Sequence, residues 1–224
     1  MERILIKNCC VIPMTGPEDL ILNGEIGIEG NSIKFIGPSG TVPQGWGSGV
    51  VIDAVGMVAM PGFINCHTHG AMTLLRSYAD DLPLMEWLSE RIWPLEERLT
   101  GEDVYWGTML AILEMIKSGT TTFADMYFYM DSVAEAVKVS GIRASLSRGM
   151  IGVAPTAQLA LDETRQFIDR WNGAEGGRIT TRVGPHAPYT CPPEYLKKVM
   201  ALAEKFNTGI HIHLAETRTE VDDI

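Results

Sequence analysis

Two histidines one residue apart, His67 and His69, follow an apolar run in the segment PGFINCHTHG. Side chains two positions apart on a strand share a face, so both imidazoles can point to one place. Imidazole nitrogen is a favoured ligand of zinc, nickel and ferrous iron, and hydrolytic metal sites use three protein ligands and an open position. By itself the pair is equally consistent with two polar residues that end a buried strand.

The other three histidines repeat this placement. His186 follows an apolar stretch, and His211 and His213 show the two-apart spacing again, with Glu216 three residues further on. Geometry alone lets either His211 or His213 be the third ligand. It also lets the Glu216 carboxylate reach the open position, although a glutamate is equally favoured in the first turn of a helix. Because all five histidines follow predicted strands, we favour a metal site, with a hydrogen-bonded core role as the alternative for His186.

The elements that must position these residues are parallel strands joined by helices. From about residue 58 onward, five short apolar runs alternate with longer helical patterns, which is typical of β/α units. Gly119 and Gly141 follow helical stretches, where a C-cap glycine is expected. In such folds the reactive groups lie at the C-terminal ends of the strands. These predicted ends carry, in order, His67 and His69, Asp125, Arg148, His186, and His211 with His213 and Glu216.

The chain divides into two predicted domains. Residues 1–57 contain short period-two runs and many turn residues, so we predict a small, sandwich-like β-sheet unit there. Residues 58–224 are predicted to form an α/β domain, a (β/α) barrel. Because a closed (β/α)8 TIM barrel has eight strands and about 250 residues, the five β/α units predict an incomplete barrel.

The amino-acid composition limits the classes of molecule that the chain is expected to bind. A chain of 224 residues with 46% hydrophobic composition can bury a substantial core. The net charge of -10 disfavours a nucleic acid or an anionic membrane surface, so we expect a small-molecule ligand. The start of the chain lacks the apolar core of a signal peptide, and the four cysteines form no CxxC pair, which favours a cytoplasmic location. The exposed sheet edge of an incomplete barrel leaves a homo-oligomer open.

Two common hydrolase signatures are absent. The chain has no HExxH motif, which disfavours a zincin protease. It also lacks the PCxxC half of the nucleotide-deaminase signature, since TCPPE around Cys191 has no second cysteine. A deaminase here would therefore use a different scaffold.

Three segments together, PGFINCHTHG, VGPHAPYT and IHIHLAET, resemble the metal-dependent amidohydrolase superfamily, in the branch that deaminates ring amines. The segment LPLMEWLSERIWPLEERLT is similar to the 5'-methylthioadenosine/S-adenosylhomocysteine deaminases, with chlorotriazine hydrolases and guanine deaminase as near relatives. The resemblance implies a TIM-barrel hydrolase that releases ammonia from a 6-aminopurine nucleoside. Guanine deamination, triazine hydrolysis, and a non-catalytic metal-binding subunit that completes its barrel with another polypeptide are the alternatives.

The resemblance also implies a ligand set. His67, His69 and His213 would bind one divalent metal ion, with zinc as the first expectation and ferrous iron or nickel as alternatives. The H-x-x-E pattern of the superfamily favours His213 over His211. Glu216 would be the catalytic acid and base and would also contact the substrate.

The remaining implied roles concern the substrate. By resemblance, His186 contacts it near the metal ion, Glu96 of WPLEE holds the ribose hydroxyls, and Arg148 faces the substrate's tail. From the residues alone, Arg148 is as readily an ordinary ion-pair partner.

The sequence departs from the superfamily pattern in two ways. Members carry a metal-ligating aspartate, usually another histidine, and the residues that complete the β unit on later strands, and these are not found in the 224 residues. The fourth strand lacks the lysine of two-metal members, which favours a single metal ion. We therefore expect the chain by itself to show little or no turnover.

Overall fold

The computed structural model describes residues 2–47 and 49–223. Within the first sixty residues, the segments with a period-two pattern form a five-stranded sheet. Strand β1 is central, with β2 and β4 on either side, β3 outside β2, and β5 paired to the end of β1. The strands are β1 (Arg3–Val11), β2 (Ile21–Glu29), β3 (Ser32–Pro38), β4 (Val50–Asp53) and β5 (Val58–Ala59). Their core is small, and its buried members are Cys9, Val11, Ile26 and Ala54.

The second sheet is parallel and has the order β6-β7-β8-β9. Its strands are β6 (Phe63–Thr68), β7 (Thr120–Tyr127), β8 (Arg143–Met150) and β9 (Ile179–Pro185). The fifth predicted strand is present only as a short bridge of Ile210 to Val183, extended by the His211 N–H, which donates to the Val183 carbonyl at 2.9 Å. Among the described residues this segment pairs with β9 alone.

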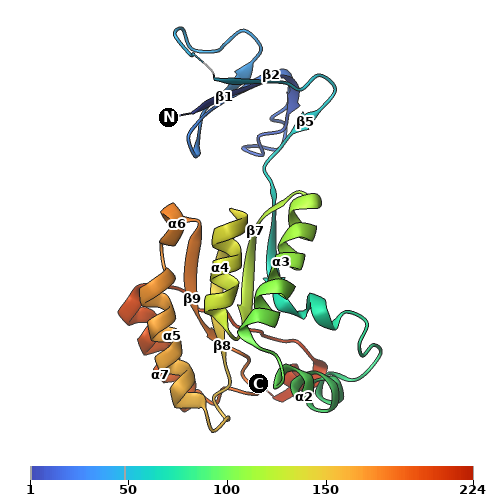
Figure 1. Cartoon of the computed structure of the whole chain (residues 1–224), viewed down its shortest axis with the longest axis vertical. Helices are drawn as coiled ribbons and strands as arrows, with labels where there is room; N and C mark the ends of the chain where they lie inside the picture. The colour runs from blue at the N-terminus through green and yellow to red at the C-terminus, as the bar shows by residue number, and fades with distance from the viewer. Residues whose placement is uncertain (1, 48, 224) are drawn as a thin grey trace. The chain divides into compact units, whose positions relative to one another are not determined.

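Helices connect the parallel strands, as the alternating pattern predicts. Figure 1 shows α3, α4, α5 and α7 next to one another along one face of the sheet, and neighbouring helices are in contact. The bounds are η1 (Gly70–Leu75), α1 (Leu84–Glu86), η2 (Trp87–Ile92), α2 (Trp93–Glu96), α3 (Gly101–Lys117), α4 (Met130–Ser140), α5 (Ala157–Trp171), α6 (Ala174–Gly177), α7 (Pro193–Phe206) and α8 (Arg218–Asp223). Within the described ranges, none of these helices is long and apolar enough to cross a membrane.

Local sequence signals set the helix ends. Thr100 and Asp103 form a reciprocal capping box that starts α3, with the Thr100 N–H donating to the Asp103 carboxylate at 2.8 Å. Gly141 caps α4 with φ 81°, and Gly119 follows α3 with φ +84°. Both glycines adopt the left-handed conformation that disfavours other residues, so the predicted helix ends are confirmed.

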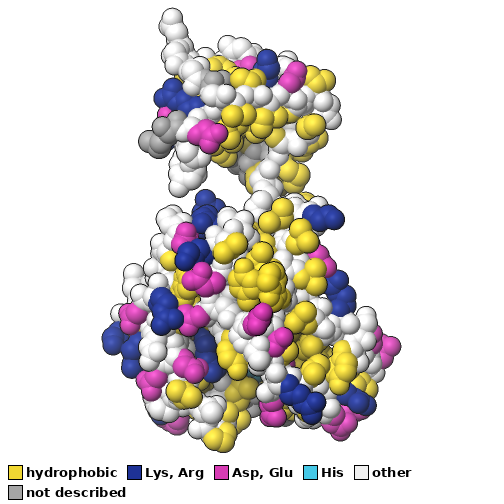
Figure 2. All heavy atoms as spheres, in the orientation of Figure 1, with side chains coloured by type: hydrophobic (Ala, Val, Ile, Leu, Met, Phe, Trp, Pro, Cys, Tyr) yellow, Lys and Arg dark blue, Asp and Glu magenta, His cyan; other side chains and the backbone are white. Residues whose placement is uncertain are grey.

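The core of the second unit lies between the sheet and its helices. Phe123 of β7 and Leu146 of β8 are fully buried there, together with Val133 of α4. Each such side chain contributes roughly 1.5–3 kcal/mol through burial. Figure 2 shows acidic and basic side chains interspersed on the surface, where ion pairs add little stability. The buried contacts therefore hold the strand ends in place.

The division of the chain falls close to the predicted one. By its internal contacts the chain forms two compact units, Met1–Gly62 and Phe63–Ile224. Strand β5 pairs with β1, so Val58 and Ala59 join the first sheet and not the parallel one. The observed alternation of parallel strands and helices confirms the α/β class of the second unit. The assignment of 1–57 and 58–224 as domains stays a prediction.

We expect Gly107→Ala to destabilise the chain. A Cβ at this position of α3 would lie 2.5 Å from the Ala71 carbonyl oxygen of η1, so the two backbones would have to separate. The cost should be about 1–3 kcal/mol, outweighing the gain of about 1 kcal/mol in helix propensity. Urea unfolding measures the change. Leu113→Ala on the exposed side of the same helix is the control, with an expected change within about 0.5 kcal/mol, and a Gly107→Ala variant as stable as the wild type would contradict the close approach.

Candidate metal centre and pocket

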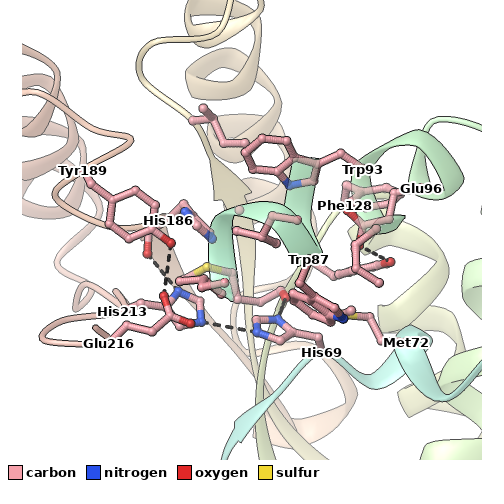
Figure 3. Close-up of a pocket in the computed structure, with 17 residues that line it drawn as sticks. His69, Met72, Trp87, Trp93, Glu96, Phe128, His186, Tyr189, His213 and Glu216 are labelled. Carbon is pink, nitrogen blue, oxygen red and sulfur yellow. Dashed lines mark hydrogen bonds between the residues drawn. The ribbon is translucent and has the colours of Figure 1, made fainter. Parts of the chain in front are cut away.

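Three of the predicted site residues converge. Potential ligand atoms of His67, His69 and His213 all lie within 4.8 Å of one another. His67 lies on β6, His69 follows that strand, and His213 follows the segment that pairs with β9. The Nε2 atoms of His69 and His213 are 3.3 Å apart, and Figure 3 shows the two rings facing each other.

Backbone carbonyls fix the orientation of two of these rings. His69 Nδ1 lies 2.7 Å from the Met126 carbonyl oxygen, and His213 Nδ1 lies 2.8 Å from that of His186. A carbonyl can only accept, so each Nδ1 carries the proton and, in the neutral ring, each Nε2 presents a lone pair. Burial lowers the pKa of His69, which favours the neutral form. The 3.3 Å contact then has no hydrogen to share, and a bound cation would satisfy both lone pairs.

The other two histidines lie beside this cluster. His186 Nδ1 is 3.0 Å from Thr190 Oγ1, and the ring of His186 lies 5.1 Å from that of His213. His211 Nδ1 is 3.0 Å from Ser147 Oγ. Burial lowers the pKa of both His186 and His211 to about 4. The structure therefore groups His213, and not His211, with the first two histidines.

Glu216 lies at the rim of the same pocket. The hydroxyl of Tyr189 donates to Glu216 Oε2 at 3.1 Å, and Figure 3 shows this pair next to His186 and His213. Burial, followed by the nearby Glu216 charge, raises the pKa of Tyr189, so the phenol stays a donor. One carboxylate oxygen of Glu216 is thus held by Tyr189.

Glu96 lines the opposite side of the pocket in Figure 3. Its Oε1 accepts a hydrogen bond of 2.7 Å from the hydroxyl of Tyr127 on β7. Burial raises the pKa of Glu96 above its ordinary value, while the bond from Tyr127 lowers it. A carboxylate in this environment readily accepts further hydrogen bonds from hydroxyl groups of a ligand.

Arg148 differs from the expectation. Its Nε and Nη2 atoms lie 2.9 and 2.7 Å from Glu163 Oε2 on α5, and it does not line the pocket. Side chains alternate along β8, and the preceding Ser147 faces the histidines, so Arg148 points to the helices. The structure does not bring Arg148 into the pocket, and the ion-pair alternative describes its contacts; a role toward the substrate's tail stays a prediction.

Most of the pocket wall is apolar, and the sequence analysis missed it. Figure 3 shows Trp87, Trp93, Phe128 and Met72 around the histidines. The remaining apolar lining residues are Leu84, Leu88, Ile92, Met126 and Ile151. Part of this wall is the π-helical turn η2, an irregularity frequent at functional sites. The available signal was the run of apolar and aromatic residues in 84–93, which reads equally well as an ordinary core helix.

A buried carboxylate supports the histidine motif from the next strand. Asp125 of β7 is fully buried, and its Oδ1 accepts hydrogen bonds from Thr68 Oγ1 at 2.7 Å and from the Gly70 N–H at 2.6 Å. Among the described residues its Oδ2 has no partner. Burial raises the pKa of Asp125 to about 6. The predicted strand end at Asp125 therefore contacts the motif itself.

Comparison with known proteins shows which family has this architecture. The amidohydrolase family model matches residues 58–224. The chain belongs to the amidohydrolase family. This membership confirms the resemblance that three short motifs carry, and the parallel sheet is consistent with an incomplete TIM barrel of the amidohydrolase type.

Relatives of the amidohydrolase chain share one name. The first is a 5-methylthioadenosine/S-adenosylhomocysteine deaminase of Pelotomaculum thermopropionicum. Its sequence identity to this chain is 65%, and the match covers the whole of this chain and 52% of the relative. The second is the enzyme of the same name from Desulforudis audaxviator. Its identity to this chain is 59%, and the match covers 99% of this chain and 51% of the relative. The chain thus spans about half the length of the relatives it matches.

Solved structures show the same fold. An adenosine deaminase from Xanthomonas campestris with bound zinc matches 98% of this chain with a TM-score of 0.91 at 32% identity, and the match covers 51% of that protein. The guanine deaminase of E. coli matches 98% of this chain and 54% of its own, with a TM-score of 0.82 at 21% identity. The second likeness concerns the fold alone.

The stability of the metal-free chain should depend on the ionisation of Asp125. Its pKa in the folded chain is about 6, against an ordinary value of 3.8. Because the folded value is raised, the contribution of Asp125 is fully present below about pH 3.8 and is lost as the pH rises through about 6. Asp125→Asn cannot ionise, so its stability relative to the wild type should rise by about 2.4 kcal/mol between pH 4 and 7. Urea unfolding across this range measures the difference, and a difference independent of pH would contradict the raised pKa.

Proposed function

We propose that this amidohydrolase chain carries the metal-binding site of a hydrolytic deaminase that acts on 6-aminopurine nucleosides of the 5'-methylthioadenosine/S-adenosylhomocysteine type. The observation that carries the proposal is the convergence of His67, His69 and His213 beside a pocket that also contains Glu216. The shared name of the relatives supports the substrate class.

The metal ion proposed for this site is a single divalent cation bound by the three imidazoles. Zinc is the first candidate, because the solved adenosine deaminase at 32% identity holds zinc, while iron and nickel share the preference for imidazole. Such an ion, when bound, lowers the pKa of a water molecule and so provides a nucleophile at neutral pH. The paired Nε2 lone pairs of His69 and His213 fit this role.

Glu216 is proposed to move the proton. Water adds to the ring carbon that bears the amino group, Glu216 takes a proton from this water, and it delivers the proton to the adjacent ring nitrogen. The proton of the newly added hydroxyl group then passes to the amino group, the carbon–nitrogen bond breaks, ammonia leaves, and the oxygen stays on the ring carbon as a carbonyl. The hydrogen bond from Tyr189 holds one carboxylate oxygen of Glu216 and leaves the other to exchange the proton. General acid–base catalysis of this kind typically contributes about 10²–10⁴-fold to the rate.

The rest of the pocket is proposed to orient the nucleoside. His186 contacts the substrate beside the histidine cluster, and Glu96 accepts hydrogen bonds from the ribose hydroxyls while Tyr127 holds its other side. The apolar surfaces of Trp87 and Phe128 suit a purine ring or a thioether substituent. A ribose-binding carboxylate favours a nucleoside over a free base or a triazine.

Glu216→Gln should abolish turnover without removing the metal ion. The chain would be fused to the C-terminal portion of the 65% identical relative from Pelotomaculum, and ammonia release would be measured from 5'-methylthioadenosine, S-adenosylhomocysteine, adenosine and guanine. We expect turnover of the thio-substituted nucleosides and a loss of kcat of about 10²–10⁴-fold in Glu216→Gln. Glu163→Gln, the same change at a residue outside the pocket, is the matched control and should keep its activity.

Other outcomes of this assay identify the alternatives. Release of ammonia from guanine alone would point to a guanine deaminase, and full activity of the Glu216→Gln fusion would contradict the proton transfer. A fusion that binds zinc but acts on no nucleoside would support a non-catalytic metal-binding role. The unfused chain should show little or no turnover.

Zinc binding by the chain itself should depend on His213 and not on His211. The structure groups His213 with His67 and His69, whereas His211 is turned to Ser147. We expect one zinc ion per wild-type chain, measured by equilibrium dialysis and elemental analysis. His213→Ala should weaken binding by at least about 100-fold, beyond the roughly 10–100-fold typical of losing an outer-shell partner. His211→Ala is the matched control, and the reverse result would contradict the ligand set.

A further inference from the structure

The end of β6 does not pair regularly with β7. Asn65 pairs with Phe123 and Thr68 pairs with Asp125, so β6 has one more residue than β7 between these two pairs. This bulge contains His67 and directly precedes His69. Bulges commonly redirect side chains at functional sites, but they also leave a backbone segment without its ladder hydrogen bonds. The orientation of the histidine motif therefore needs support from outside the ladder.

Three consecutive residues of β7 provide that support. The Thr68 hydroxyl lies 2.8 Å from the Ala124 carbonyl oxygen and 2.7 Å from Asp125 Oδ1, and the Gly70 N–H donates to the same Oδ1 at 2.6 Å. His69 Nδ1 donates to the Met126 carbonyl oxygen at 2.7 Å. The Asp125 side chain thus holds the Thr68 hydroxyl and the Gly70 backbone N–H, on either side of His69, while the next residue of β7 holds the ring.

Packing does not explain a carboxylate at this position. Asp125 is fully buried, its Oδ2 has no partner among the described residues, and it takes part in no ion pair found in those residues. Burial of an uncompensated carboxylate costs stability. A Cβ at Gly70 would lie 3.3 Å from Oδ1, a tight contact, so the two groups approach each other closely.

We propose that Asp125 is a positioning residue of the metal centre, which sets the conformation of residues 67–70 so that His67 and His69 present their nitrogens to one ion. This inference rests on the proposed function, since it takes the three histidines to be ligands. Asp125 binds no substrate and acts only through the histidine motif. The histidine cluster therefore depends on a side chain of β7, the strand next to β6.

The test is the zinc affinity of the chain, measured by competition with a chromogenic chelator. Asp125→Ala should lower the affinity about 10–100-fold, as is typical when an outer-shell partner of a ligand is lost. Asp125→Asn should stay within about threefold of the wild type, because the amide oxygen can accept the same two hydrogen bonds. The visible spectrum of the cobalt-loaded chain should change in Asp125→Ala and be preserved in Asp125→Asn.

Thr164→Ala is the matched control for stability. Thr164 is a buried residue of α5 whose hydroxyl donates to the Ala160 carbonyl oxygen at 2.8 Å, on a helix that provides no residue of the histidine cluster. This variant should lower the unfolding midpoint without changing zinc affinity. If Asp125→Ala does not fold, Thr68→Val replaces it, and we expect its affinity to fall at least about threefold because one of the two Asp125 bonds is lost.

A folded Asp125→Ala chain that binds zinc as tightly as the wild type would overturn the inference. So would a loss of affinity in Thr164→Ala equal to that in Asp125→Ala, or an unchanged Thr68→Val where that variant is the substitute. In each of these cases the wild type still binds zinc and the proposed function stands. A wild-type chain that binds no zinc would instead remove the proposed metal centre, and with it this inference.

Discussion

The hydrogen bond between His69 Nδ1 and the Met126 carbonyl, 2.7 Å long, joins the histidine motif to the second strand of the parallel sheet. It selects the tautomer of His69 and directs Nε2 toward His213, whose own Nδ1 is held by the His186 carbonyl. Because carbonyl groups cannot donate, both rings must turn an unprotonated nitrogen to the same point. These two bonds direct the free ring nitrogens of His69 and His213 toward each other. They form at the edge of the sheet where the C-terminal ends of the parallel strands meet.

Burial has opposite consequences for the two kinds of titratable group around the pocket. It lowers the pKa of His69 and of His186, which favours the neutral form of these two rings. It raises the pKa of Glu96 and Asp125, whose charged forms are disfavoured away from water. Glu216 is exposed at the rim, so its environment differs from that of both buried carboxylates. One pocket thus contains imidazoles of lowered pKa, the Glu96 carboxylate that accepts a hydrogen bond from Tyr127, and the exposed Glu216 carboxylate.

The relation to the amidohydrolases gives this geometry a context. The relatives named deaminases match the chain over its whole length but extend to about twice that length. The chain contains the first four strands of the sheet and the histidines that follow them and the next segment. It therefore contains the part of the fold in which His67, His69 and His213 are brought together.

The sequence by itself predicted most of the elements and the residues that could form a site. Periodicity identified the parallel strands and the helices between them, because a buried strand and an amphipathic helix differ in their apolar spacing. Placement at strand ends identified the five histidines and Glu216, because parallel strands direct their C-terminal ends to one edge.

Only the tertiary structure decided which of these residues meet. Contacts between segments place His213, which the H-x-x-E resemblance already favoured, beside His67 and His69 and turn His211 to Ser147. Arg148 turns toward Glu163 because of the side of β8 that it faces. Pairing between strands produces the bulge at His67. Contacts between segments far apart in the chain produce the support from Asp125 and the pocket wall formed by Trp87 and Phe128. Such contacts leave no local pattern, since a buried aspartate or an apolar helix turn has the same sequence signal wherever its partner lies.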